Sequence, residues 1–528
     1  MRYPASTLLL VACGGSNPSM SWTGGELSRD GEPELGLIGV ANLDDDDQDG
    51  LPDFDDDNVD NDNDRTELTI DAGKKGGTLA LAGEGVRIWR DGSIWLEDGE
   101  SADLEGKELL DVHVEFEQPM DHGVLTLTPK KGDALALDLW AAPALMNHHL
   151  QQTERVWALS VSDGAGWNNA KLIGKLQKLL GDKYTDVPGP QYSCDVWMQD
   201  EWEATTTTGP AHRMDVVLDS IRDGGGDPDW PGLTEMPADF LEAPDVARIV
   251  RGSGYATTYD STGNLEVSPP LGDQHPFGRI YYGSKGDDGM AQGMREFLHQ
   301  QRLQDPYEID TTWLCVGHVD EFMTFVPDPS APRGFRFLFT DTSLGWKIIE
   351  SMPGTTTLPK YRSKPPYGHG YATPAAILAD NALRSYNDRL QSTHLDPIRE
   401  QMRTELGLSD EEVVLVPGVF EEFVDESWGP CGAVALVPGT SNLLVLNDGD
   451  QTQVVMPDPF LRSNSSDQTG DPMIEAWTEL LPSTIETHFV DDWSVYHMGL
   501  GEVHCGTNQF RTPTESWWTA AAPLMEAQ

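Results

Sequence analysis

The sequence predicts a protein of two parts: an all-β domain of the immunoglobulin-like sandwich type, followed by a larger α/β domain. Two patterns predict this. Between residues 66 and 139, short runs of alternating apolar and polar residues are separated by turns that contain Gly and Asp, which is typical of half-buried strands in a sandwich. After Trp140, stretches of helical and strand periodicity alternate, which is typical of an α/β fold.

Length and charge limit the functions that fit. A chain of 528 residues is long enough for two or three domains, and 38% hydrophobic residues with 16 Trp favour a packed globular protein. The net charge of −53, from 88 acidic and 35 basic residues, argues against nucleic acid as a partner, because phosphate binding needs a basic surface. It favours cations, either metal ions or a positively charged substrate. Solubility in salty surroundings explains part of the same excess.

The first residues have the features of a bacterial export signal. Residues 1–13, MRYPASTLLLVAC, combine Arg2 with a short apolar run that ends in small residues, and LVAC resembles a lipobox, in which the cysteine is lipidated. We expect an exported lipoprotein, anchored at a bacterial membrane through Cys13 and followed by a flexible tether over residues 14–35. The alternative is a disordered start with a chance match. No apolar run of 18 residues follows, so we expect membrane contact only through the lipid.

An acidic loop follows the predicted tether. Residues 42–64 contain twelve Asp, some of them spaced two apart before Gly50, which is a pattern of hard oxygen ligands suited to calcium. The register is open, and a solvated acidic linker is the alternative. The candidate calcium ligands in this loop are Asn42, Asp44, Asp46, Asp49, Asp53 and Asp64.

Periodicity places the remaining elements in order. The strands of the first domain carry the apolar pairs Val86/Ile88, Ile94/Leu96, Val112/Val114 and Leu125/Leu127. In the α/β part, strands are predicted at 155–161 and 335–341, and helices at 169–180, 290–303, 374–384 and 397–406. No glycine-rich phosphate-binding loop is present in the sequence, so nucleotide binding has no support.

The chemistry is predicted from four segments. In LGEVHCGTN, residues 500–508, Cys505 lies in a polar, tight turn where an exposed thiolate can act as a nucleophile. VWMQDEWEA, residues 196–204, is interpreted as a strand with polar groups on both faces. VGHVDEFMTFVP, residues 316–327, places His318 and Asp320 on one strand face, and DSTGNLEVSPP, residues 260–270, is a turn followed by an acidic residue. An inert cysteine, a surface His–Asp pair and a core tryptophan are the alternatives.

At these four segments the sequence resembles the protein-arginine deiminases, in their order and rough spacing. The resemblance implies a calcium-dependent enzyme that converts peptidyl arginine to citrulline and ammonia on a pentein-type α/β-propeller catalytic domain. With the patterns above, it gives an immunoglobulin-like domain over 36–139 and a catalytic domain over 140–528.

The resemblance also implies roles for single residues. Asp200 and Asp320 would bind the guanidinium, His318 would be the acid and base, and Cys505 the nucleophile that forms a thiouronium intermediate. Trp197 would wall the methylene stem of the arginine. The run DSIRDGG, residues 219–225, keeps Arg222 where the family grips the peptide backbone but has Gly224 in place of a second arginine.

Two calcium sites in the catalytic domain follow from the same resemblance. One would use Gln199, Glu203 and Glu266 with the carbonyls of Thr262 and Leu265, and the other Glu201, Asp219, Asp223 and the Ser220 carbonyl. The substrates would be arginine-containing proteins or peptides. Two rival functions stay open: a deiminase of free arginine or agmatine, and a calcium-binding surface protein without catalysis. The scattered spacing of the cysteines demands no disulfide, and whether Cys194 and Cys431 pair also stays open.

Overall fold

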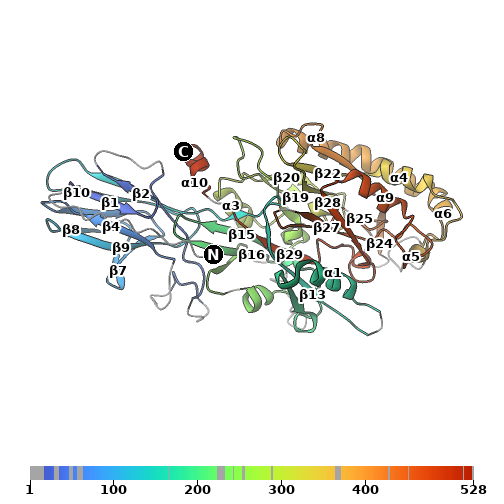
Figure 1. Ribbon diagram of the computed structural model, residues 1–528, viewed down its shortest axis with the longest axis horizontal. Helices are drawn as coiled ribbons and strands as arrows, with labels where there is room; N and C mark the ends of the chain where they lie inside the picture. Colours follow the sequence, from blue (N-terminus) through green and yellow to red (C-terminus); the bar gives the residue numbers. More distant parts are fainter. Residues whose placement is uncertain are drawn as a thin grey trace.

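The structure is a computed structural model of the chain. It describes residues 17–28, 35–46, 51–55, 64–164, 166–222, 232–241, 243–252, 256–286, 289–362, 370–425, 429–439, 441–449, 451–514 and 516–525. The molecule is elongated, with an all-β part at one end and a larger mixed α/β part at the other (Figure 1).

The all-β part consists of two sheets. Every strand pair in them is antiparallel except β3 with β11. Apolar residues of both sheets form one core, as the alternating pattern predicts. The first sheet has the order β2 (Gly25–Leu27), β1 (Ser19–Trp22), β4 (Thr66–Asp71), β9 (Leu109–Phe116), β6 (Val86–Arg90), β7 (Ser93–Leu96). The second has the order β3 (Leu37–Gly39), β11 (Leu135–Ala141), β10 (His122–Pro129), β5 (Gly77–Ala82), β8 (Ser101–Leu104).

The segment predicted as a flexible tether forms strands where the structure describes it. β1 pairs with β4 from Ser19↔Asp71 to Trp22↔Leu68, and β2 folds back onto β1 as a hairpin. Met20 is fully buried and Leu27 nearly so. The Gly and Ser content of the segment suggested a linker, but these two apolar side chains extend the sandwich core, and this part of the prediction is wrong.

The larger part repeats one strand pattern five times. In each unit the middle strand pairs antiparallel with one neighbour and parallel with the other. In chain order, four of the units are β15 (Trp202–Thr208), β16 (Arg213–Asp219), β17 (Val246–Val250); β18 (Leu265–Val267), β19 (Ile280–Ser284), β20 (Tyr307–Asp310); β21 (Met323–Pro327), β22 (Phe335–Asp341), β23 (Val413–Pro417); and β26 (Leu444–Asn447), β27 (Thr452–Pro457), β28 (Ile485–Val490). The fifth joins β29 (Thr507–Arg511), near the end of the chain, to β13 (Thr153–Ser160) and β14 (Tyr184–Pro188). The described residues thus form a mixed α/β fold of many small sheets, with no closed barrel among them.

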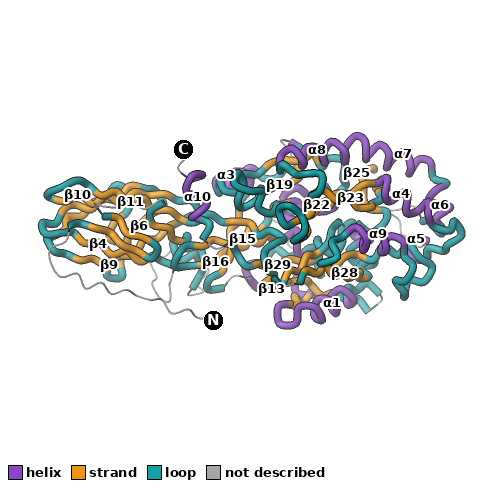
Figure 2. Tube along the Cα trace, turned by 45° about the horizontal axis from the view of Figure 1, so that its top comes forward, coloured by secondary structure: helices purple, strands orange, loops and turns teal. Residues whose placement is uncertain are grey.

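Helices connect the parallel strands of four of these units and lie on the outside of the larger part (Figure 2). Their buried faces carry the apolar positions that helical periodicity predicts. They are α1 (Ala170–Leu180), α3 (Gln292–Gln300), α4 (Thr342–Ser351), α5 (Pro359–Arg362), α6 (Pro374–Leu378), α7 (Asn381–Leu390), α8 (Asp396–Glu405) and α9 (Pro472–Leu480); α10 (Trp518–Met525) follows the last strand. Among the described residues no helix has both the length and the apolar character that crossing a bilayer requires.

Three predicted elements differ from the structure. The predicted helix over 374–384 is two helices, because the Asp380 carboxylate accepts the Leu383 N–H (2.9 Å) and begins α7. Residues 198–201, predicted as strand, form the short helix α2 (Met198–Glu201) ahead of β15. His318 and Asp320 lie at the 3-10 turn η7 (Val319–Glu321), so they do not share a strand face.

A disulfide crosses the larger part. Cys315 pairs with Cys431, which lies in β25 (Gly429–Ala435), and β25 forms a hairpin with β24 (Phe420–Asp425). Backbone hydrogen bonds reinforce the link: Ala433 donates to Trp313 (2.8 Å) and accepts from Cys315 (3.0 Å). Cys431 is exposed and Cys315 is half-buried. Among the cysteines that the structure describes, Cys194 and Cys505 are free thiols. The segment that leads into η7 is therefore fixed to β25.

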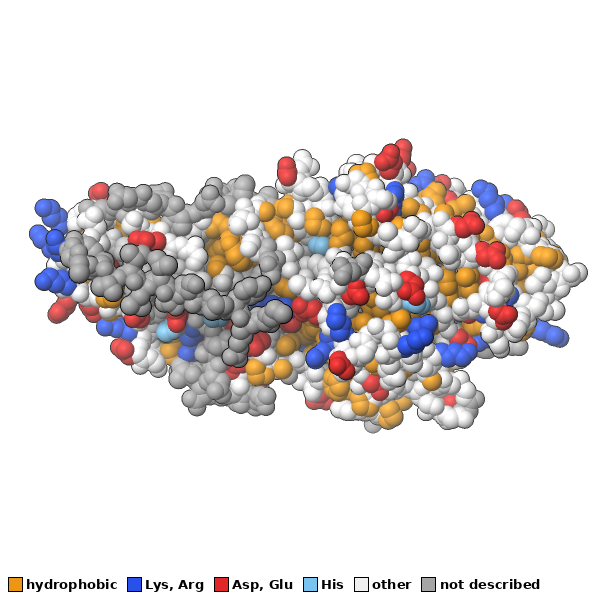
Figure 3. All heavy atoms as spheres, viewed as in Figure 1, with side chains coloured by type: hydrophobic (Ala, Val, Ile, Leu, Met, Phe, Trp, Pro, Cys, Tyr) orange, Lys and Arg blue, Asp and Glu red, His pale blue; other side chains and the backbone are white. Residues whose placement is uncertain are grey.

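The surface carries acidic and basic side chains side by side on the face in Figure 3, where Lys and Arg gather at the end of the all-β part. Exposed lysines follow β4 and β10 in the sequence: Lys74, Lys75, Lys130 and Lys131. The acidic excess of the chain is therefore not uniform.

Candidate active site

Cys505 lies in the tight turn between η9 (His497–Gly499) and β29. The Thr507 N–H donates to the His504 carbonyl (2.9 Å) and closes the turn, while the Cys505 carbonyl accepts the Gln199 N–H (3.0 Å). The sequence indicated an exposed thiol, yet Cys505 is only 5% exposed. The turn is packed between α2 and the side chain of Asn442.

Three groups converge on one oxygen of Asp320, which is itself buried. Its Oδ2 lies 2.9 Å from His504 Nδ1, 2.7 Å from Asn442 Nδ2 and 3.4 Å from Cys505 Sγ. Neither His504 nor Asn442 was assigned a role from the sequence. His504 lies within the motif GEVHC, so the sequence could have pointed to it. Asn442 lies in a loop far from all four predicted segments, and no sequence pattern marks it as a site residue.

His504 is held between two carboxylates. Its Nδ1 contacts Asp320 and its Nε2 lies 3.5 Å from Glu266 Oε1. Burial alone would lower the pKa of His504, but the hydrogen bond to Asp320 and the charge of Glu266 outweigh it and raise the pKa above its ordinary value. The protonated form of His504 is therefore favoured next to Asp320.

His318 faces Asp200. Its Nε2 donates to the Thr258 carbonyl (2.8 Å), so the opposite nitrogen, Nδ1, is the one that lies 3.5 Å from Asp200 Oδ1. Glu321 accepts the His318 N–H (2.9 Å) and fixes the start of η7. A protonated His318 has an N–H for each partner, while the neutral ring keeps Nδ1 free to accept a proton.

Gly263 marks the point where three of the predicted residues meet. A Cβ added at this glycine would lie 2.5 Å from Asp200 Oδ1, 3.1 Å from His318 Nδ1 and 3.6 Å from Asp320 Oδ2. Through Asp320, the same group reaches Cys505 Sγ. The structure thus brings together Asp200, His318, Asp320 and Cys505 from three distant segments of the chain.

The charges of this group act on the sulfur. Burial raises the pKa of the Cys505 thiol well above its ordinary value, and the negative charges of Asp320 and Asp200 raise it further. Burial also raises the pKa of Asp200, while His318 and Arg222 lower it in part. A cation bound between the carboxylates and the sulfur would oppose these effects and favour the thiolate.

Trp197 lies against the turn that leads to Cys505. A Cβ on Gly501 would come within 2.4 Å of the Trp197 ring and 3.2 Å of Cys505 Cβ, and the ring packs edge-on against Tyr496 at 5.8 Å. Trp197 itself is half-buried. An apolar wall next to the sulfur is the environment that the methylene groups of an arginine side chain would contact.

A small cavity, partly open to solvent, adjoins this turn. Asn442, Gly501 and Glu502 line it, together with further acidic residues such as Glu321 and Glu421. Carboxylates in such a lining favour a cationic ligand.

The first group of predicted calcium ligands is partly assembled in the structure. Gln199 Nε2 donates to Glu203 Oε2 (2.7 Å), and the Gln199 carbonyl accepts the Thr262 hydroxyl (2.6 Å). Glu203 and Glu266 are buried and repel each other, so that burial and this repulsion raise the pKa of Glu203 well above its ordinary value. Burial likewise raises the pKa of Glu266 to about 7. Leu265, the remaining predicted ligand, precedes Glu266 in β18.

The second group is held by arginines. Glu201 is fully buried, its carbonyl accepts the Ser220 N–H (2.8 Å), and β15 and β16 place Asp219 beside it. Arg222 Nη1 lies 2.9 Å from Asp195 and 3.3 Å from Glu201, and Arg248 Nη1 lies 2.8 Å from Asp219. The guanidinium of Arg222, predicted to hold the substrate backbone, thus pairs with Asp195 and Glu201 in this structure. Asp223, the fourth predicted member, lies outside the described residues.

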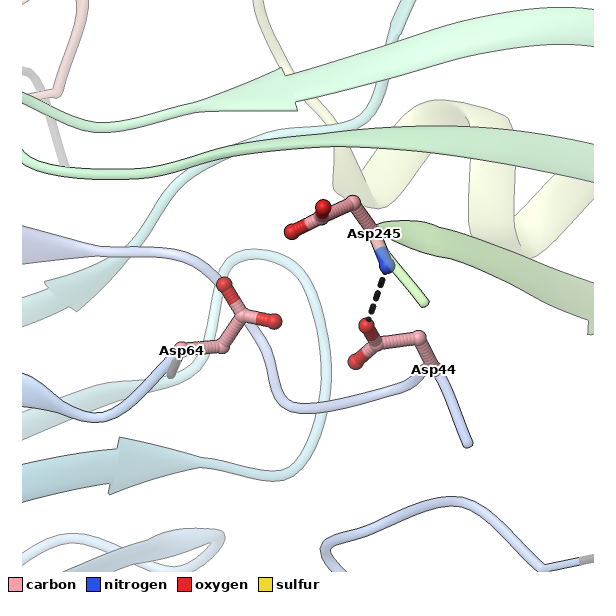
Figure 4. A group of neighbouring side chains, drawn as sticks. All are labelled: Asp44, Asp64 and Asp245. Atoms are coloured by element: carbon pink, nitrogen blue, oxygen red, sulfur yellow. Dashed lines mark hydrogen bonds between the residues drawn. The ribbon is translucent and has the colours of Figure 1, made fainter. Parts of the chain in front are cut away.

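The acidic loop meets the larger part at Asp245. Asp44 Oδ2 accepts the Asp245 N–H (2.8 Å), and carboxylate oxygens of Asp44, Asp64 and Asp245 lie within 4.8 Å of one another (Figure 4). Burial raises the pKa of Asp44 to about 6. Asp245 was not predicted, because it is remote from the loop in sequence.

The other predicted ligands of the loop surround this group. The Asn42 side-chain amide donates to Glu115 (2.8 Å), and the backbone carbonyl of Asn42 accepts the Phe54 N–H (3.1 Å). The Asp53 carboxylate accepts the Asp46 N–H (3.3 Å). Asp49 and the predicted lipidation site Cys13 lie outside the described residues.

Comparison with known proteins gives a consistent family. Residues 133–519 match the sequence model of the family described as protein-arginine deiminase (PAD). Protein-arginine deiminase type-4 of Homo sapiens is 30% identical over 461 residues, which cover 78% of this chain and 63% of that protein. The type-3 enzyme of Homo sapiens is 32% identical over 371 residues, 66% of this chain and 51% of that protein. The chain thus spans about half to two thirds of the length of these relatives.

Among solved structures, a substrate-bound agmatine deiminase from C. jejuni aligns with 71% of this chain and 98% of its own, with 8% identity and a TM-score of 0.41. A TM-score this low does not assign a fold.

Proposed function

The chain belongs to the protein-arginine deiminase family, and we propose that it hydrolyses peptidyl arginine to peptidyl citrulline and ammonia. The observation that carries this proposal is the convergence of Asp200, His318 and Asp320 around Gly263, with Cys505 Sγ 3.4 Å from Asp320. A nucleophile, an acid–base group and two carboxylates are the groups that this hydrolysis requires.

The two carboxylates recognise the substrate. A guanidinium is a permanent planar cation whose forked N–H groups match carboxylate oxygens. Asp200 and Asp320 come from different segments of the chain and both lie next to Gly263, so one guanidinium can contact both carboxylates. Its positive charge also opposes the negative field that holds the Cys505 thiol protonated, so substrate binding itself promotes the thiolate.

The reaction then proceeds in two displacements. The Cys505 thiolate attacks the guanidinium carbon and forms a C–S bond; one C–N bond breaks, and His318 gives the proton on Nδ1 to the departing nitrogen, which leaves as ammonia. The product of this step is the thiouronium intermediate. Neutral His318 then takes one proton from water, whose oxygen attacks the same carbon. The C–S bond breaks and releases the thiolate, and the second proton of the former water leaves to solvent as the neutral C=O group of citrulline forms.

Calcium is proposed as the cofactor. Gln199, Glu203 and Glu266 supply hard oxygen ligands, and the buried Glu203–Glu266 repulsion is what a divalent cation would relieve. Glu201, Asp219, Ser220 and Asp223 are proposed as a second set, and the loop carboxylates with Asp245 as a third. Bound calcium would supply positive charge next to Asp200, which Gln199 and Glu201 flank. Within the chain, Thr262 and Gln199 keep α2 and the Gly263 turn together.

The fold is proposed to be a pentein-type propeller, preceded by an immunoglobulin-like sandwich. The five units with one shared pairing pattern support the first assignment, and two sheets with a common core support the second. Export and lipidation at Cys13 are proposed from the LVAC sequence. Mass spectrometry of the N-terminal peptide from membranes would reveal the lipid, and an unmodified Cys13 in mature protein would contradict it.

The test is a citrulline assay on the full chain with a blocked arginyl ester, free arginine and agmatine in parallel. We expect product from the ester, none after exhaustive removal of calcium, and recovery on calcium addition. Cys505→Ser should abolish the product without lowering the melting temperature. Turnover of free arginine or agmatine alone would support the rival enzyme, and absence of all product with calcium bound would support a non-catalytic surface protein.

A further inference from the structure

We infer that Asn442 is a further residue of the catalytic centre. It fixes the position of the nucleophilic sulfur relative to the Asp320 carboxylate and donates an N–H to each. The inference rests on the proposed function. Asn442 lies in the loop that precedes β26, 63 residues from Cys505, and is 2% exposed.

The side chain of Asn442 is used entirely inside the site. Its Nδ2 lies 2.7 Å from Asp320 Oδ2 and 3.1 Å from Cys505 Sγ, and its Oδ1 accepts the Cys505 N–H at 3.2 Å. An amide nitrogen has two N–H groups, so both contacts can be made at once. The orientation of the amide follows from its partners, because only the oxygen can accept the Cys505 N–H.

These contacts address a physical problem of the site. During the reaction the sulfur is an anion, and it lies 3.4 Å from an oxygen of Asp320 that must itself be negative to bind a guanidinium. Two like charges at this distance repel strongly in a buried environment. Asn442 places a hydrogen-bond donor against each of them without adding charge, and its oxygen fixes the backbone from which the sulfur projects.

The backbone of Asn442 belongs to the same arrangement. Its carbonyl accepts the His504 N–H (3.4 Å), and its own N–H donates to Gly439 (2.9 Å). The Gly439 N–H in turn donates to Glu502 (2.7 Å), three residues before Cys505. The Asn442 loop and the Cys505 turn are thus joined at several points, so the side chain cannot leave the site without disturbing the turn.

Two substitutions distinguish hydrogen-bond donation by Asn442 from simple filling of space. Asn442→Asp keeps the size and the oxygen that accepts the Cys505 N–H but replaces the donor with a negative oxygen. Asn442→Ala removes the contacts and leaves a cavity. If Asn442 only fills space, Ala is the more harmful; if it is the donor to the two charged groups, Asp is the more harmful.

The experiment measures two rates at one pH on the calcium-loaded full chain with Cys194→Ser as background. One is alkylation of Cys505 by iodoacetamide, followed by mass spectrometry, and the other is kcat with the arginyl ester. We expect Asn442→Ala to lower both about 10-fold and Asn442→Asp about 100-fold, since hydrogen bonds to charged groups have this strength. Alkylation needs no substrate, so the inference is tested even if the chain forms no citrulline.

Asn387 provides a matched control. It is equally buried and makes three side-chain hydrogen bonds, to the Leu383 and Phe420 carbonyls (3.0 and 2.8 Å) and from the Phe420 N–H (2.9 Å), away from the site. Asn387→Asp should lower the melting temperature and leave alkylation of Cys505 unchanged. Equal rates for parent and Asn442→Ala, or a slower Ala than Asp variant, would overturn the inference. Should Asn442→Asp not fold, Asn442→Leu, which keeps the bulk but has no donor, takes its place: both rates should fall at least as far as in Asn442→Ala, and parent-like rates would overturn the inference.

Discussion

Gly263 provides the space in which Asp200, His318 and Asp320 approach one another. Because an added Cβ would lie 2.5 Å from Asp200 Oδ1, Gly263→Ala must displace that carboxylate. We expect kcat/KM for the arginyl ester to fall about 100-fold, the usual cost of a misplacement near 1 Å. The citrulline assay measures this change.

The control for this substitution is Gly174→Ala in α1, where nothing lies within 4 Å of the added Cβ. It should leave activity unchanged and stabilise the helix by about 0.5–1 kcal/mol. Full activity of Gly263→Ala would mean that the three side chains do not act together.

Asp320 has two opposing effects on the chemistry. Its charge raises the pKa of Cys505, yet the proposed mechanism needs that charge to bind the substrate. Asp320→Asn should therefore speed alkylation of Cys505 at neutral pH, because more thiolate is present, while it slows citrulline formation by at least about 100-fold. A decrease of both rates would contradict this division of roles.

At this scale the sequence was informative where residue type and motif coincide. Cys505, His318, Asp200 and Asp320 are reactive residues in distinctive segments, and the structure brings them together. Gly263 lies in the predicted turn of residues 260–270, but neither a glycine in a turn nor an amide in a loop, such as Asn442, has a pattern that reveals its role at the site. The burial of Cys505 was also missed, since the residues that cover it are distant in sequence.

The Cys315–Cys431 disulfide fixes the segment that leads to His318. It closes a loop of 116 residues, and such a loop corresponds to up to roughly 4–5 kcal/mol of lost entropy in the unfolded chain. The double substitution of Cys315→Ser and Cys431→Ser should lower the free energy of unfolding by up to this amount, as measured by urea titration. Cys194→Ser should change it by less than about 1 kcal/mol. Unchanged urea midpoints for the double variant would argue against a structural role.

His148, which follows β12 (Leu145–Met146), makes the free energy of unfolding depend on pH in the acid range. Burial, with the charge of Arg511, lowers the pKa of His148 from 6.5 to about 3. The unfolded chain binds this proton first, so stability is lost as the pH falls from about 6.5 towards 3. His148→Asn should reduce that loss by a few kcal/mol in urea titrations at a series of pH values. His299→Asn, at an exposed helix position, should leave the slope as in the parent.

Elements were predicted well where periodicity is long and poorly where a short run is shaped by tertiary contacts. The predicted helix over 169–180 and strand over 335–341 match α1 and β22. The alternation over residues 196–204 suggested a strand, but α2 turns Gln199 and Glu201 to separate partners. Four residues are too few for a helical period to stand out from an alternating one.

Asp245 connects the acidic loop of the all-β part to the start of β17 in the larger part. Calcium at the three carboxylates would stabilise the folded chain by mass action and join the two parts. We expect calcium to raise the melting temperature of the parent, and to raise that of Asp245→Asn by several degrees less. Asp273→Asn, at an exposed position, should respond like the parent. Equal calcium responses for parent and Asp245→Asn would exclude this ligand.

For the molecule as a whole, the sequence indicated the order of the two parts but not how they are joined. The tether prediction failed because Met20 and Leu27 are too few to form a recognisable pattern, although both are buried. Likewise, the pairing of β29 with β13 closes the fifth unit across more than 340 residues, and no local signal reports such a contact.

The disulfide and the nucleophile have opposite chemical requirements. In the proposed mechanism Cys505 works only as a free thiol. Cys315, three residues from His318, is in a disulfide whose other cysteine, Cys431, is open to solvent. A strong dithiol added in the purification buffer to keep Cys505 active will therefore also cleave the exposed crosslink. Preparations handled with different reducing agents will contain different mixtures of crosslinked and open molecules, and specific activities compared between them must be normalised to titrated thiol content.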